Sequence, residues 1–77
     1  MTHREMYDEV FEKNGHLPQF QKICLLAQLV YANHQNDSEY TKDDAVWEAL
    51  EKYEDMSGRW FDPTHEEFDR IKSAIIG

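Results

Sequence analysis

Hydrophobic residues recur at spacings of three and four positions in four separate segments of the 77-residue chain. This spacing places side chains on one face of an α-helix, and no segment shows the strict alternation that is typical of a half-buried strand. Glycine and proline residues separate the segments at Gly15, Pro18, Gly58 and Pro63. The pattern predicts four helices, over residues 3–13, 18–34, 42–56 and 64–76.

Three of these helices open with a threonine that is followed three residues later by an acid. The pairs are Thr2–Glu5, Thr41–Asp44 and Thr64–Glu67. This is the capping-box pattern, although the second pair has Asp in place of the usual Glu or Gln. The last helix has an alternative start, with Asp62 as N-cap and Pro63 at the first helical position. Pro18 also suits a first helical position.

The predicted helix over residues 18–34 is apolar around most of its circumference. Its hydrophobic residues are Phe20, Ile23, Cys24, Leu25, Leu26, Ala27, Leu29, Val30 and Tyr31. A helix that is hydrophobic nearly all round is buried by its neighbours. We therefore predict an all-α fold, a compact four-helix domain in which the second helix is central. At this length the chain forms a single domain, residues 1–77.

The predicted third helix has two opposite faces. Its core face consists of Ala45, Val46, Ala49, Leu50, Tyr53 and Met56. The opposite side, here called the acidic face, consists of Asp43, Asp44, Glu48, Glu51, Glu54 and Asp55. Trp47 falls within the acidic face and away from the core face. Residues 37–57 hold eight acids and two lysines, and therefore carry most of the net charge of −8.

The connector between the last two helices, residues 57–63, reads SGRWFDP and contains two adjacent large aromatic residues. We expect Trp60 and Phe61 to close the open end of a small core, with the indole N–H of Trp60 at its rim. The alternative is an exposed binding patch that includes Arg59, because Trp, Tyr and Arg are enriched in interface hot spots.

Charge and cysteine content limit the class of protein. Sixteen acids face eight scattered bases, so direct binding of DNA or RNA is disfavoured, because it depends on clustered Lys and Arg. No apolar run approaches the roughly 20 residues of a membrane span, and the N-terminal sequence does not resemble a signal peptide. Cys24 is the only cysteine, which excludes an intramolecular disulfide and leads us to expect a cytoplasmic location.

The sequence contains no recognisable catalytic or metal-binding motif. Its four histidines lack zinc-site spacing, and the polar segment 33–44 lacks both the glycine and the final Glu of an EF-hand loop. Cys24 lies on an apolar helix face, where a thiol is inert. We therefore expect no enzymatic activity, no metal and no cofactor.

These properties predict a small acidic protein that binds a protein partner as an inhibitor or neutraliser. Antitoxins, immunity proteins and inhibitors from mobile elements act in this way. The partner would be basic, because complementary charge selects among partners. In a stricter version it is a nucleic-acid-binding protein, which the carboxylates would block by imitating the phosphates of DNA or RNA. The candidate binding residues are Asp43, Asp44, Trp47, Glu48, Glu51, Glu54, Asp55, Arg59 and Trp60.

Other interpretations remain open. The acidic face is also typical of an ordinary solvated helix surface. The chain could instead be a structural homo-oligomer, with Leu25, Leu29 and Ile76 in a contact that is insensitive to salt. A helix-turn-helix regulator built from the last two helices is disfavoured by the acidic outer face of the third helix.

Overall fold

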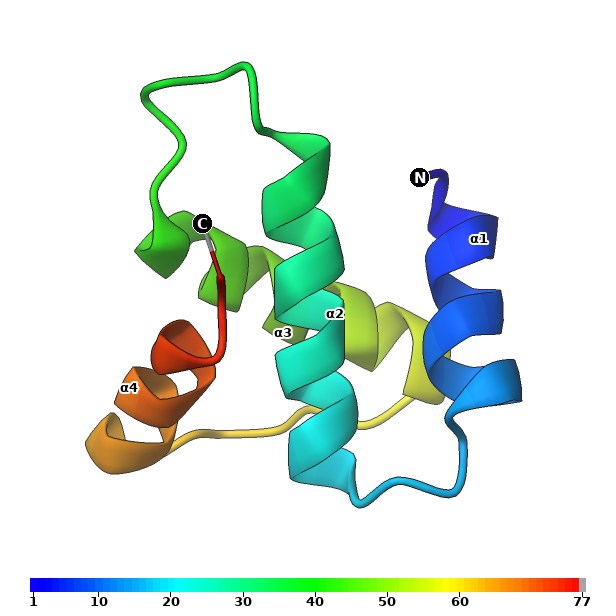
Figure 1. Ribbon diagram of the computed structural model, residues 1–77. Coiled ribbons are helices and arrows are strands. Elements are labelled where there is room, and N and C mark those ends of the chain that lie inside the picture. The colour runs from blue at the N-terminus through cyan, green and yellow to red at the C-terminus, as the bar shows by residue number, and fades with distance from the viewer. Residues whose placement is uncertain (77) are drawn as a thin grey trace.

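The computed structural model describes residues 1–76 and confirms the all-α fold class (Figure 1). The elements are α1 (His3–Tyr7), the π-helix η1 (Asp8–Lys13), α2 (Gln19–Asn33), α3 (Lys42–Ser57) and α4 (His65–Ser73). η1 continues directly from α1, so residues 1–76 contain four helical segments, close to the predicted ranges. α4 is shorter than predicted, because the helix ends at Ser73 rather than at residue 76.

All three capping boxes form. In each, the threonine hydroxyl accepts a hydrogen bond from the backbone N–H three residues later, and the acid accepts one from the threonine N–H. The start of α4 is therefore capped by Thr64, and the alternative start at Asp62 and Pro63 is wrong. Pro18 is the N-cap of α2, with ψ at 153°, and not its first helical residue.

The C-terminal end of α3 depends on a glycine. Gly58 has φ at +75°, in the left-handed region, and its N–H donates a 2.8 Å hydrogen bond to the carbonyl of Glu54. Glycine adopts this conformation without strain because it has no Cβ, and this conformation ends the helix. The sequence predicts the same end of the helix.

The first helical segment differs from the prediction, because Asp8–Lys13 form a π-helix rather than the second half of an α-helix. Asn14 extends this wide turn, since its Nδ2 donates a 2.7 Å bond to the carbonyl of Glu9, five residues earlier. A Cβ at Gly15 would lie 2.3 Å from the carbonyl oxygen of Phe11, so the exit from this turn requires glycine. Over one turn, the spacing of apolar residues does not separate a π-helix from an α-helix.

The core lies around α2, as predicted. α2 packs most extensively against α3, which crosses behind it, and it also contacts η1 and α4 (Figure 1). The buried hydrophobic residues are Met6, Val10, Ile23, Leu26, Ala27, Val30, Ala45, Val46, Ala49, Leu50, Tyr53, Ile71 and Ile75. The predicted core face of α3 is confirmed, with only Met56 half-buried. On α2, Cys24, Leu25 and Leu29 are half-buried and pack against the edge of the core.

The two aromatic residues of the connector separate in the structure. Phe61 packs against the core, and its ring centroid lies 6.3 Å from that of Phe20. The Cζ atom of Arg70 lies 4.9 Å from the centroid of the Phe20 ring. Trp60 is 47% exposed, so the expectation that it closes the core is wrong. Phe61 fills the place beside Phe20, and Trp60 is left on the surface.

Candidate functional site

A groove of about 370 Å³ lies between α3, the end of the connector and α4. Its lining residues are Asp43, Trp47, Asp62, Pro63, Thr64, His65, Phe68, Asp69 and Lys72. We call it the Trp47 groove. It brings Asp43 and Trp47 of the predicted acidic face together with residues of α4 that were not predicted to bind a partner.

Two aromatic rings form the apolar part of the groove. The ring centroids of Trp47 and Phe68 lie 5.2 Å apart, with an interplanar angle of 51°. Phe68 is half-buried against the core, whereas Trp47 remains 50% exposed. Trp47 is thus supported on one side by α4 and is open on the other.

Carboxylates surround the exposed ring. Asp43 lies one helical turn before Trp47, and Glu51 lies one turn after it on the same face of α3. Asp62 and Asp69 line the groove from the connector and from α4. A side chain that reached the open side of Trp47 would therefore enter a negatively charged environment.

Lys72 is the one Lys or Arg side chain that lines the groove. Its Nζ lies 2.8 Å from Oδ1 of Asp43, and this hydrogen bond raises the pKa of Lys72 above its ordinary value. The ion pair joins the first turn of α3 to the last turn of α4. A second contact is 3.7 Å long, between Nε2 of His65 and Oδ2 of Asp69.

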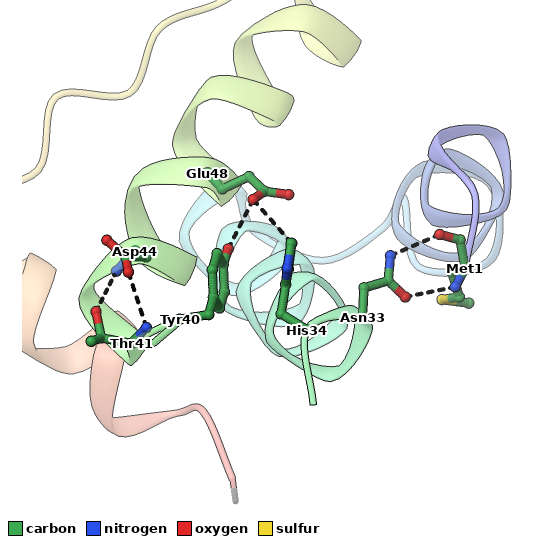
Figure 2. A network of polar contacts seen from close by, with 7 residues as sticks. All are labelled: Met1, Asn33, His34, Tyr40, Thr41, Asp44 and Glu48. Carbon is green, nitrogen blue, oxygen red and sulfur yellow. Dashed lines mark hydrogen bonds and ion pairs between the residues drawn. The ribbon is translucent and has the colours of Figure 1, made fainter. Parts of the chain in front are cut away.

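Glu48 is held by other side chains of the protein, so its predicted role in binding a partner is not supported by its position. Figure 2 shows its Oε1 accepting a 2.9 Å bond from the hydroxyl of Tyr40 and lying 3.4 Å from Nε2 of His34. The rings of His34 and Tyr40 stack at 3.8 Å. Burial and the bond to Glu48 raise the pKa of Tyr40, which keeps its hydroxyl protonated as a donor. Glu48 thereby holds the loop between α2 and α3.

Two further polar contacts in Figure 2 fix the chain around this loop. Oδ2 of Asp44 accepts a 3.0 Å bond from the N–H of Thr41 as part of the capping box. The side chain of Asn33 bonds to both the ammonium and the carbonyl group of Met1, at 2.6 and 2.7 Å. Asp44 thus stabilises the start of α3, although it remains exposed.

The remaining carboxylates of the acidic face, Glu51, Glu54 and Asp55, are exposed. Within residues 1–76 none of the three has an ion-pair or side-chain hydrogen-bond partner. Glu54 and Asp55 also lie in the last turn of α3, where no basic residue is present. Negative charge at a helix C-terminus is unfavourable, because it faces the negative end of the helix dipole. These two carboxylates therefore destabilise the helix that carries them.

This arrangement gives a prediction for stability. The double substitution Glu54→Gln and Asp55→Asn should raise the free energy of unfolding by about 0.5–1 kcal/mol at low salt, because it removes charge from the negative end of the dipole. Urea denaturation followed by circular dichroism measures the change.

Glu66→Gln is the matched control. Glu66 is exposed and lies in the first turn of α4, where the dipole favours negative charge. This substitution should lower the free energy of unfolding slightly. Glu66→Gln removes one charge and the double variant removes two. A rise in the free energy of unfolding in both, about half as large for Glu66→Gln, would show that net charge, and not the helix dipole, determines the result.

Arg59 and Trp60 are exposed on the connector, but neither lines the Trp47 groove. Of the nine predicted binding residues, two line the groove, and the other five residues of the acidic face lie outside it as well. Asp43 and Trp47 lie in the groove, whereas Arg59 and Trp60 lie outside it. Lys72 and Phe68 were missed because their contacts with α3 depend on how α4 packs, which no spacing along the sequence reports.

Within residues 1–76, no group of three or more His, Cys, Asp or Glu side chains is arranged to hold a metal ion. In the same range, every helix is too short or too polar to cross a membrane. No protein-family model matches the chain, and no curated protein or solved structure matches it. The chemistry of the surface is therefore the basis for assigning a function.

Proposed function

We propose that the protein has no chemistry of its own and binds a basic protein partner through the acidic face and the adjoining Trp47 groove, as an inhibitor or neutraliser. The observation that carries this proposal is Trp47, a half-exposed aromatic ring next to the unpaired carboxylate of Glu51. Buried aromatic anchors supply much of the binding energy of protein interfaces. Complementary charge accelerates association and selects among partners.

Nucleic-acid-binding proteins are the partner class that fits this surface best. Their binding surfaces are rich in Lys and Arg that neutralise phosphates, and a row of carboxylates on a helix offers a similar pattern of negative charge. Inhibition would follow from occupation of that surface. Burial raises the pKa of the Cys24 thiol, so it stays protonated and unreactive. A single cysteine, which can form no intramolecular disulfide, fits the cytoplasmic location that we propose.

The structure gives less support to the two alternatives. Of the apolar residues considered for a homo-oligomer contact, Ile76 is 85% exposed, but Leu25 and Leu29 are half-buried against the core. A helix-turn-helix role needs basic side chains free to reach phosphates. On α4, however, Arg70 and Lys72 are outnumbered by three acids, Glu66, Glu67 and Asp69.

The test is an affinity pull-down from a lysate of the source organism at low and high salt. Wild type is compared with Trp47→Ala, after circular dichroism shows that both are folded. The matched control is Trp60→Ala, because Trp60 is similarly exposed, at 47% against 50%, but lies outside the groove. We expect a basic protein to be retained at low salt, and to be lost at high salt or with Trp47→Ala, but not with Trp60→Ala.

A different outcome would overturn the proposal. If the bait recovers only its own copies, at either salt concentration and with every variant, self-association becomes the function to pursue. Equal loss of a partner with Trp47→Ala and Trp60→Ala would show that the contact is not confined to the groove and includes the connector.

A further inference from the structure

The open side of Trp47 is suited to a cation. The face of an indole ring carries negative electrostatic potential and attracts ammonium and guanidinium groups, more strongly than Tyr or Phe do. Phe68 supports the ring from one side, and half of the Trp47 surface remains accessible to a partner. An apolar side chain would also cover this ring, but it would gain no favourable contact with the surrounding carboxylates.

The walls of the groove favour a guanidinium in particular. Asp43, Asp62 and Asp69 all line the groove around the aromatic rings. A guanidinium is planar, stacks on aromatic faces and presents five N–H donors in a fork that matches carboxylates. The volume of about 370 Å³ is sufficient for one long side chain.

Lys72 shows that a cation already binds at this place. Its ammonium lies 2.8 Å from Asp43, and the two side chains are 45% and 56% exposed. Ion pairs that are this exposed to solvent are weak, so a better-matched cation can replace the ammonium. Lys72 therefore marks a cation position in the groove and also competes for it.

We propose that the Trp47 groove receives an arginine side chain of the partner, which stacks on Trp47 and displaces Lys72 from Asp43. The inference rests on the proposed function, since the arginine belongs to the basic partner. The group recognised is the guanidinium of that arginine, and Lys72 competes with it for Asp43.

The test uses a labelled, alanine-rich helical peptide with three arginines at four-residue spacing, the spacing of Asp43, Trp47 and Glu51 along α3. Its citrulline analogue has nearly the same shape but no charge. Fluorescence anisotropy should give a Kd of about 0.1–1 mM for the arginine peptide and no saturable binding for the citrulline peptide. A lysine version should bind less tightly than the arginine version, because an ammonium lacks the planar fork.

A second readout locates the contact. In Trp60→Phe, Trp47 is the only tryptophan, so a saturable change in tryptophan emission reports on the groove itself. The arginine peptide should produce this change with the Kd found by anisotropy. Trp47→Leu keeps an apolar side chain in place and should weaken binding about five- to thirtyfold.

Substitution of the competing lysine gives the sharpest result. Lys72→Met should tighten binding of the arginine peptide about two- to fivefold, because it frees Asp43. Lys13→Met is the matched control. Lys13 is also paired with a carboxylate, that of Glu9 at 3.2 Å, but it lies at the end of η1, away from the groove. It changes the net charge by the same amount and should leave the Kd unchanged.

Several outcomes would overturn the proposal. These are equal tightening by Lys13→Met and Lys72→Met, saturable binding of the citrulline peptide, or constant Trp47 emission during titration. The comparison of peptides uses wild-type protein, so it remains decisive even if a variant fails to fold. If a basic partner is retained from lysate in a Trp47-dependent manner while the peptide tests fail, only the arginine site is wrong. If the peptide tests succeed and no basic partner is found, the proposed function is wrong instead.

Discussion

We expect Leu50→Ala to leave much of the protein unfolded at 25 °C. Leu50 is fully buried on the face of α3 that packs against α2. Truncation of a buried leucine costs about 2–5 kcal/mol, through the lost transfer free energy and the cavity left behind. A domain of this length without a disulfide has a total stability of only about 3–5 kcal/mol. Far-UV circular dichroism and urea denaturation of both proteins measure the loss.

Leu29→Ala is the control for this experiment. Leu29 is half-buried at the edge of the core, so its truncation should cost only about 1 kcal/mol. If Leu50→Ala unfolds at the same urea concentration as wild type, the core around α3 is not the source of stability. Repeating the measurement at several protein concentrations shows whether association of copies contributes, since that contribution rises with concentration.

The second large effect is expected on binding. Glu51→Lys with Asp55→Lys reverses two unpaired charges of the acidic face, one on each of two successive turns of α3. Like charges brought together at an interface cost several kcal/mol, so affinity for the basic partner should fall about a hundredfold or more at low salt. Isothermal titration calorimetry with the partner measures the change.

A matched pair of substitutions can be made in η1, outside α3 and the Trp47 groove. Asp8→Lys with Glu12→Lys also reverses two exposed carboxylates at four-residue spacing, on η1, and changes the net charge by the same amount. This variant should retain most of the affinity, because its charges lie outside the proposed binding surface. If both double variants lose affinity equally, the partner responds to the total charge of the protein, and no particular face binds it.

The starts of α1, α3 and α4 and the end of α3 could be predicted because they depend on local chemistry. Each threonine that opens a helix forms its bonds within three residues, and Gly58 ends α3 through its own backbone conformation. The central position of α2 follows from its nearly continuous apolar surface. Trp47 was placed on the acidic face by helical geometry alone, and the structure leaves it half exposed there.

The contacts between helices could not be predicted in the same way. Phe68 and Lys72 reach Trp47 and Asp43 only because α4 packs beside the first half of α3. The role of Glu48 depends on a tyrosine and a histidine from the preceding loop. Phe61 and Trp60 have similar chemistry and adjacent positions, so their different exposure is decided by the space beside Phe20.

The order in which the helices pack has a consequence for how quickly the protein forms. Elements that follow one another along the chain are mostly in contact, with η1 on α2, α2 on α3 and α3 on α4. Helical domains dominated by such sequence-local contacts fold in microseconds to milliseconds. A ribosome adds only about 5–20 residues per second. Once α4 has left the ribosome, the packing of the helices should therefore be complete before the next residue is added.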